Sequence, residues 1–281
     1  ILRARRILGP PGVLGPVTSN EVLARGRAEE FRRKQGVSES TPIGDVFEFV
    51  QRTTGVDVMS VRADLAEHGL LMQDTASGRA CIAVSVNMHP MRQRSSVIHE
   101  LGHLLAGDLD DGQTLPSGVR NNAEVQADAF CRYLLLPISA VGEGPSLEVS
   151  DTSTLSALVQ TFGVSPAIAA IQLRKAGRIT SRTNTVWMNL STRQVAAVHG
   201  WLDRYDQLAA ASDEPRAPQG LLARAVAAYQ AGVLSINELA VWYRRDPTEL
   251  EAELGVPDQS PVTESDPWDS TASIFDAPDG R

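Results

Sequence analysis

Three residues of one short run, His99, Glu100 and His103, have the types and the spacing of a metal site that hydrolyses amide bonds. In an α-helix four residues turn the chain by about 400°, so His99 and His103 project from the same face, one turn apart. Both imidazoles can then bind one metal ion, with Glu100 beside them as a general base. Burying these three groups in an otherwise apolar helix is unfavourable unless a ligand satisfies them. The run therefore predicts a metal-dependent hydrolase.

A catalytic zinc site needs a third protein ligand, and the sequence after His103 limits the choice. A metzincin has Gly three residues after this histidine and His six residues after it, but Ala106 and Leu109 stand there. Glu124 is the favoured ligand because it opens a second predicted helix. Asp128 lies one turn later on the same face, where it can accept a hydrogen bond from a ligating histidine. The remaining candidates are carboxylates of the polar loop between the helices, Asp108, Asp110 and Asp111.

Together these groups predict hydrolysis of peptide bonds. A zinc ion held by His99, His103 and Glu124 supplies a water of lowered pKa and polarises the substrate carbonyl, and manganese is the alternative metal. Glu100 takes the proton of the attacking water and passes it to the leaving amine. Peptidases of this kind bind the substrate as an added strand, and the predicted strand at residues 80–87 is the expected edge for it. Four more residues are candidate transition-state partners, although a structural role is favoured for each: His89, Arg92, Arg94 and Tyr133.

The elements that position these residues follow from hydrophobic periodicity and turn signals. Apolar residues at helical spacing predict a helix at residues 43–53, and alternation predicts strands at 56–61, 70–73 and 80–87. The metal residues fall on predicted helices at 95–105 and 121–136. The rest of the chain to residue 254 is predicted to be helical, apart from a candidate strand at 185–190. This pattern predicts an α+β, zincin-like metallopeptidase domain with a small sheet, followed by an all-helical region.

Four segments are predicted along the chain. They are an N-terminal helical extension at 1–40, a metallopeptidase core at 41–140, a helical region at 141–255 and an acidic flexible tail at 256–281. Within the helical region, residues 153–180 are expected to form a helix-turn-helix-like unit and residues 192–255 a helical bundle. In residues 21–34 arginines alternate with glutamates, which is typical of a solvated helix face rather than of a nucleic-acid-binding arm.

Two runs of the sequence resemble the ImmA/IrrE family of metallopeptidases. Residues 91–105 (MRQRSSVIHELGHLL) correspond to an arginine-containing segment that leads into HExxH, and residues 124–137 (EVQADAFCRYLLLP) to the E-x-x-A-[N/D]-x-F-A-x-x-L-L-x-P helix that supplies the third ligand. The resemblance covers residues 42–137 closely and extends to 155–179. Cys131 replaces the usual Ala, and Ser95-Ser96 replace Phe-Thr. The resemblance implies an endopeptidase that cleaves a helix-turn-helix repressor and so releases genes of mobile elements or of the DNA-damage response.

Direct DNA binding is the main alternative, because residues 163–166 form a turn between two apolar-periodic helices, as in a helix-turn-helix. A helix that reads bases needs polar donors along its exposed face, whereas residues 166–176 carry cations only near the end, at Arg174 and Lys175. Packing against the peptidase is therefore favoured. A regulator that binds DNA or a partner around a sensory or structural metal is disfavoured, since structural zinc takes four protein ligands.

Composition narrows the class further. The chain has 281 residues, 42% of them hydrophobic, and a net charge of −8, as expected for a globular protein without a membrane span. Its two cysteines, Cys81 and Cys131, form no CxxC pair, which favours a reducing, cytoplasmic location. Residues 1–16 have no sustained apolar core and are a poor signal peptide. The expected partner is a protein substrate, and the sequence does not predict an oligomeric state.

Overall fold

The computed structural model describes residues 2–6, 19–62, 69–74, 76–87, 89–107, 122–243 and 245–257. The predicted loop with Asp108, Asp110 and Asp111, and nearly all of the predicted acidic tail, lie outside these described residues. Contacts divide the chain into two units, residues 1–218 and residues 219–281. The predicted α+β class is confirmed, because one small sheet is accompanied by helices throughout the described part of the chain.

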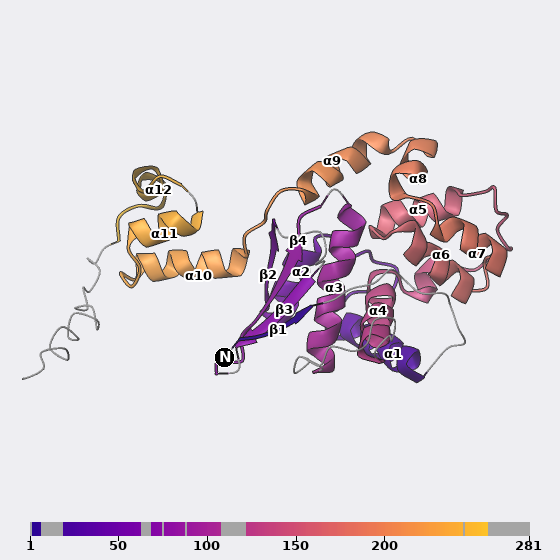
Figure 1. Cartoon of the computed structure of the whole chain (residues 1–281), viewed down its shortest axis with the longest axis horizontal. Helices are drawn as coiled ribbons and strands as arrows, with labels where there is room; N and C mark the ends of the chain where they lie inside the picture. The colour runs from indigo at the N-terminus through magenta and orange to yellow at the C-terminus, as the bar shows by residue number, and fades with distance from the viewer. Residues whose placement is uncertain are drawn as a thin grey trace, which may run out of the picture. The chain divides into compact units, whose positions relative to one another are not determined.

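Unit 1 contains a four-stranded mixed sheet with the strand order β1-β3-β4-β2 (Figure 1). The strands are β1 (Leu2–Arg6), β2 (Asp57–Val61), β3 (Gly69–Asp74) and β4 (Ala80–Ser85). β2 runs parallel to β4, whereas β3 is antiparallel to β4 and β1 is antiparallel to β3. The prediction that residues 80–87 form the exposed edge is wrong, since β4 lies inside the sheet. Its second neighbour in the sheet is β2, although β3 lies between β2 and β4 in the sequence. Such a parallel pairing leaves no signal in the local sequence.

Nine α-helices and one short 3₁₀ helix follow or surround the sheet in the described part of unit 1. They are α1 (Ser19–Lys34), α2 (Val46–Thr54), α3 (Pro90–Ala106), α4 (Asn122–Leu135), η1 (Ile138–Val141), α5 (Ser153–Phe162), α6 (Pro166–Lys175), α7 (Ser181–Met188), α8 (Thr192–Val198) and α9 (Leu202–Ser212). α3 packs on β3 and β4, α4 packs on α3, and α1 packs on α4 (Figure 1). α3 begins five residues earlier than predicted because Pro90 fits the first turn of a helix, where no N–H is needed.

α5 and α6 form the predicted helix-turn-helix-like unit. Gly163 ends α5 in the left-handed conformation, Ser165 caps α6, and the chain turns by 114° between the two helices. α6 is largely buried: Gln172 is 0% exposed and its side chain donates a hydrogen bond to the Leu136 carbonyl at 2.6 Å. This burial agrees with the expectation that α6 packs against the peptidase.

The candidate strand at residues 185–190 is wrong, because α7 runs through most of this segment. The Thr180 side chain accepts a hydrogen bond from the Thr183 backbone N–H and so starts the helix. Trp187 is fully buried, and its indole N–H donates to the Val149 carbonyl at 2.9 Å. Tertiary packing of one tryptophan therefore outweighs the strand propensity of the neighbouring threonines and valine.

Unit 2 is a small helical unit made of α10 (Gln219–Gln230), α11 (Ile236–Tyr243) and α12 (Pro247–Leu254). Its own core gathers around Tyr229 and Leu239, and the Tyr229 hydroxyl donates to the Gly255 carbonyl at 2.8 Å. Within the described part of the chain, no single helix has the length and apolar character that a membrane crossing requires.

Candidate metal centre

α3 and α4 bring three of the predicted residues together. The Nε2 atoms of His99 and His103 are 3.0 Å apart, Glu124 Oε2 is 3.3 Å from His99 Nε2, and Glu124 Oε1 is 3.8 Å from His103 Nε2. Two donors that bind one tetrahedral zinc ion at about 2.0 Å are roughly 3.3 Å apart. The three distances thus fit a shared metal ion, and one ligand atom from each residue lies within 4.8 Å of the others.

The close approach of the two helices depends on Gly102, between the two histidines. A Cβ atom at this position would lie 3.1 Å from Cδ1 of the Phe130 ring and 3.2 Å from the Ala127 Cα atom. A larger residue would therefore push α4 away from α3 and carry Glu124 away from the histidines. The sequence analysis missed this role, although the small residues Gly102 and Ala127 on facing helices are the signal that could have indicated it.

Asp128 lies beside the other ring nitrogen of His99. Its Oδ1 atom is 3.0 Å from His99 Nδ1, which leaves Nε2 of this ring facing His103 and Glu124. Burial by itself lowers the pKa of His99, but the hydrogen bonds with Asp128 and Glu124 and the negative charges of Asp128 and Glu100 raise it to about 9. The two histidines in turn hold the pKa of Glu124 well below its usual value, against the opposing effect of burial. This electrostatic balance favours a positive charge at the centre, so the donor set fits a divalent cation.

Glu100 points away from solvent, toward the sheet. It is 1% exposed, and a Cβ atom on Gly69 would lie 2.5 Å from its Oε1 atom. The carboxylate therefore lies against the first residue of β3, a place that only glycine leaves open. Sequence reasoning did not identify Gly69, because nothing local connects it to Glu100, which lies 31 residues later in the chain.

The four candidate transition-state partners have other surroundings in the structure. Arg94 binds backbone carbonyls that belong to the loop before α2 and to the end of α5: Ile43 at 2.6 Å, Gly163 at 3.0 Å, Phe162 at 3.5 Å, and Gly44. It thus ties the metal-binding helix to the helix-turn-helix-like unit. His89 and Arg92 are exposed, and the Tyr133 hydroxyl donates to Glu21 at 3.0 Å. The contacts of Arg94 and Tyr133 agree with the structural role that the sequence favours for them.

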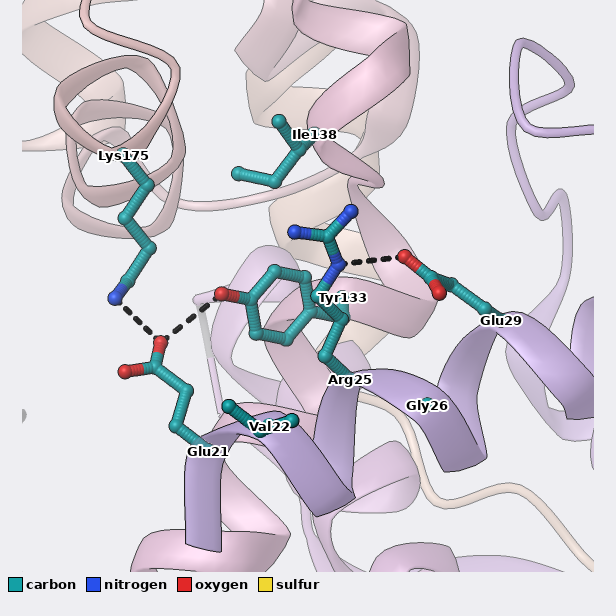
Figure 2. Close-up of a pocket in the computed structure, with 8 residues that line it drawn as sticks. All are labelled: Glu21, Val22, Arg25, Gly26, Glu29, Tyr133, Ile138 and Lys175. Atoms are coloured by element: carbon teal, nitrogen blue, oxygen red, sulfur yellow. Dashed lines mark hydrogen bonds and ion pairs between the residues drawn. The ribbon is translucent and has the colours of Figure 1, made fainter. Parts of the chain in front are cut away.

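A second group of charged residues lines a pocket of about 440 Å³ between α1, α4, η1 and α6, which we call the α1–α4–α6 pocket (Figure 2). Lys175 Nζ is 2.5 Å from Glu21 Oε1, the oxygen that also accepts the Tyr133 hydrogen bond, and Arg25 pairs with Glu29 at 2.6 Å. Burial raises the pKa of Glu21, but the contacts with Lys175 and Tyr133 and the charge of Arg132 outweigh it and lower the pKa below 4.5.

α1 is more deeply embedded than its predicted solvated face suggests. Glu21 is 7% exposed and Arg32 is 1% exposed. Arg32 donates to the carbonyls of Leu134 and Ser38, each at 2.6 Å, and to that of Thr41. This arginine fastens the end of α1 to the end of α4. The expectation of a solvated face holds for the arginine–glutamate pairs on the outer side of α1, such as Arg25–Glu29, and is wrong for these two residues.

A sheet-packed helix that carries HExxH, joined by a glutamate from the next helix, is the arrangement of a zincin-type metallopeptidase. Residues 53–174 match the family Peptidase M78, described as the IrrE N-terminal-like domain. Over these residues the chain is similar to the ImmA/IrrE family of metallopeptidases, and the resemblance found in the sequence is confirmed there. A comparison with proteins of curated function gives no match.

Proposed function

We propose that this protein is a zinc-dependent endopeptidase that cleaves a regulatory protein, most simply a helix-turn-helix repressor, in the cytoplasm. One observation carries the proposal: ligand atoms of His99, His103 and Glu124 lie within 4.8 Å of one another, and Glu100, which follows His99 in α3, is buried. Three protein ligands leave a fourth position open on a tetrahedral ion, as catalysis requires. The regulatory substrate and the switching of stress or mobile-element genes rest on the family resemblance alone.

Each residue of the centre has a separate task in this proposal. His99, His103 and Glu124 hold the metal, which when bound supplies an activated water and polarises the peptide carbonyl. Glu100 accepts the proton of the attacking water and delivers it to the nitrogen of the leaving amine. Asp128 accepts the Nδ1–H hydrogen bond of His99 and so fixes the ring with Nε2 toward the centre.

The burial of α6 supports a peptidase rather than a DNA-binding protein. Gln172 is an uncharged polar side chain of α6 that could read a base, but it is fully buried and bound to the Leu136 carbonyl inside the fold. The connection through Arg94 also joins the helix-turn-helix-like unit to α3. We therefore assign this unit to the support of the metal centre.

The proposal is tested by comparing the wild-type chain with Glu100→Gln in cells, with and without DNA damage. Newly formed protein N-termini are identified by mass spectrometry, and the metal content of both purified chains is measured. We expect N-termini that depend on Glu100, at least one of them in a small helix-turn-helix protein. Loss of the general base should slow cleavage by about 100-fold or more while zinc is retained.

Glu48→Gln is the matched control, because Glu48 is an exposed glutamate in the first turn of α2. It should leave the pattern of N-termini unchanged. Identical N-termini in wild-type and Glu100→Gln cells, with zinc present in both proteins, would refute the peptidase proposal. Manganese in place of zinc in the purified protein would refute only the choice of metal.

A further inference from the structure

The outer edge of β3 leads directly to the metal centre. Gly69, the first residue of β3, pairs with Val84 of β4 on one side and lies against the Glu100 carboxylate. An extended peptide that added to the other side of β3 would therefore pass beside the general base. Such strand addition uses main-chain hydrogen bonds and accepts many sequences, as a peptidase needs.

This edge of β3 is occupied by β1 of the same chain. The two strands are antiparallel over five residue pairs, from Leu2 opposite Asp74 to Arg6 opposite Leu70. The Arg6 end of β1 is thus one residue pair from Gly69, and the strand runs toward Glu100. The backbone of β1 therefore has the position and the direction expected of a substrate peptide that binds along β3 and extends to the metal centre.

The opposite edge of the sheet is differently placed. β4 lies between β2 and β3. On the outer side of β2, Ser60 forms an isolated antiparallel β-bridge with Arg216. Two backbone hydrogen bonds form this bridge, from Ser60 N–H to the Arg216 carbonyl at 2.9 Å and from Arg216 N–H to the Ser60 carbonyl at 3.1 Å. Of the two sheet edges, the one that leads to Glu100 is therefore the edge that β1 covers.

We propose that β1 is an internal competitor for the substrate strand, so that the centre accepts a peptide only in molecules whose β1 has left β3. The inference rests on the proposed function, since it assigns the regulation of the same site. A strand in the same chain competes at an effective concentration of about millimolar, which no dilute substrate matches. The apparent affinity for substrate falls by the fraction of molecules with a free β3 edge.

The test uses a disulfide staple between β1 and β3. Arg3 and Gln73 are opposite each other in the register, so Arg3→Cys/Gln73→Cys places two thiols across the strand pair. The staple is formed in glutathione buffer and measured by mass spectrometry, with Arg3→Cys and Gln73→Cys alone as controls. The probe is a fluorescein-labelled peptide hydroxamate, which binds zinc peptidases without being hydrolysed, and its affinity for the zinc-loaded chain is read by anisotropy.

We expect the stapled chain to bind the probe at least about tenfold more weakly than the same chain after reduction, because the free-edge fraction goes to zero. A second variant, Ala4→Pro/Arg5→Pro, works in the opposite direction. Successive N–H groups of a strand face opposite edges, so one of the two prolines removes a hydrogen bond to β3. This variant should bind the probe several-fold more tightly than wild type, whereas Ala4→Val/Arg5→Val, which keeps the strand, should not.

Equal probe affinity in the stapled and reduced chains would overturn the inference, because β1 would then lie outside the substrate path. Failure of the double-proline variant to bind the probe more tightly than wild type would also overturn it. Failure of the proposed function can be distinguished from failure of this inference. If the chain binds the probe as described but cleaves no protein in a Glu100-dependent manner, β1 competes for the β3 edge and the protein is not an active peptidase.

Discussion

Two groups of charged residues pack against helix α4, and they are balanced in different ways. In the α1–α4–α6 pocket each carboxylate has a cation of the chain beside it, Lys175 for Glu21 and Arg25 for Glu29 (Figure 2). In the metal centre Glu124 and Asp128 face histidine nitrogens, which are positive only after taking up a proton. The pocket is neutralised by its own side chains. The centre is completed by a cation from outside, a proton or a metal ion.

The two groups also differ in what fixes their geometry. The pocket is held by the ion pairs themselves, whereas the metal centre is held by backbone approach, through Gly102 against α4 and Gly69 against Glu100. Removing a charge should therefore affect stability in the pocket and metal affinity in the centre. Four predictions test this difference.

The largest effect is expected from Glu124→Ala. Loss of a partner outside the ligand set commonly costs about 10- to 100-fold in metal affinity, so loss of a ligand should exceed about 100-fold. Zinc affinity is measured by competition with a chromophoric chelator. The matched change in the pocket, Glu21→Ala, should leave zinc affinity within about twofold, since changes at sites that share no partners add independently. Similar losses in both variants would contradict the division between the two groups.

Gly102→Ala should weaken zinc binding without altering a single donor. The added methyl group meets Phe130 and the Ala127 backbone, so α4 must shift, and we expect about a tenfold loss of affinity and about 1–3 kcal/mol of stability. The control is Gly26→Ala, where nothing lies within 4 Å of the new Cβ in the middle of α1. It should stabilise the fold by about 0.5–1 kcal/mol. Unchanged zinc affinity in Gly102→Ala would show that α4 is not positioned by this contact.

In the pocket, Glu21→Gln should destabilise the protein, because it leaves Lys175 without its closest carboxylate. We expect a loss of about 1–3 kcal/mol in the free energy of unfolding, measured with urea. Glu29→Gln removes the exposed ion pair with Arg25 and should change stability by less than about 0.5 kcal/mol. Equal effects of the two substitutions would mean that the buried pair contributes no more than the exposed one.

The smallest effect concerns acid pH. The pKa of Glu21 is lower in the folded protein than its usual 4.5, so its stabilisation is fully present above that pH and is lost as the pH falls through the folded value. The difference in unfolding free energy between wild type and Glu21→Gln should be constant from neutral pH down to about 5 and should then shrink. If the difference in unfolding free energy instead grew below pH 4.5, the pH dependence would have the opposite sign. The ion pair of Glu21 could then not be the source of the difference.

The local parts of the site were predictable from sequence, and the non-local parts were not. The two histidines and Glu100 could be predicted from their spacing on one helix. Glu124 and Asp128 could be predicted because they lie one turn apart on a second predicted helix. The roles of Gly102 and Gly69 depend on which elements meet in space, and no local pattern records that meeting. The same reason explains why the edge of the sheet was assigned to β4: strand order depends on the pairing of β2, which is distant in sequence.

Both cysteines are free, and burial, the largest cause in each case, raises the pKa of Cys81 to about 11 and that of Cys131 to about 12. The Cys131 thiol is also engaged, since it donates to the Ser95 carbonyl at 3.3 Å. At neutral pH the reactive thiolate form of both is therefore scarce. A fluorophore maleimide added to a variant with one new surface cysteine should label that position selectively, so distance measurements by energy transfer can be made on this chain without removing its native thiols.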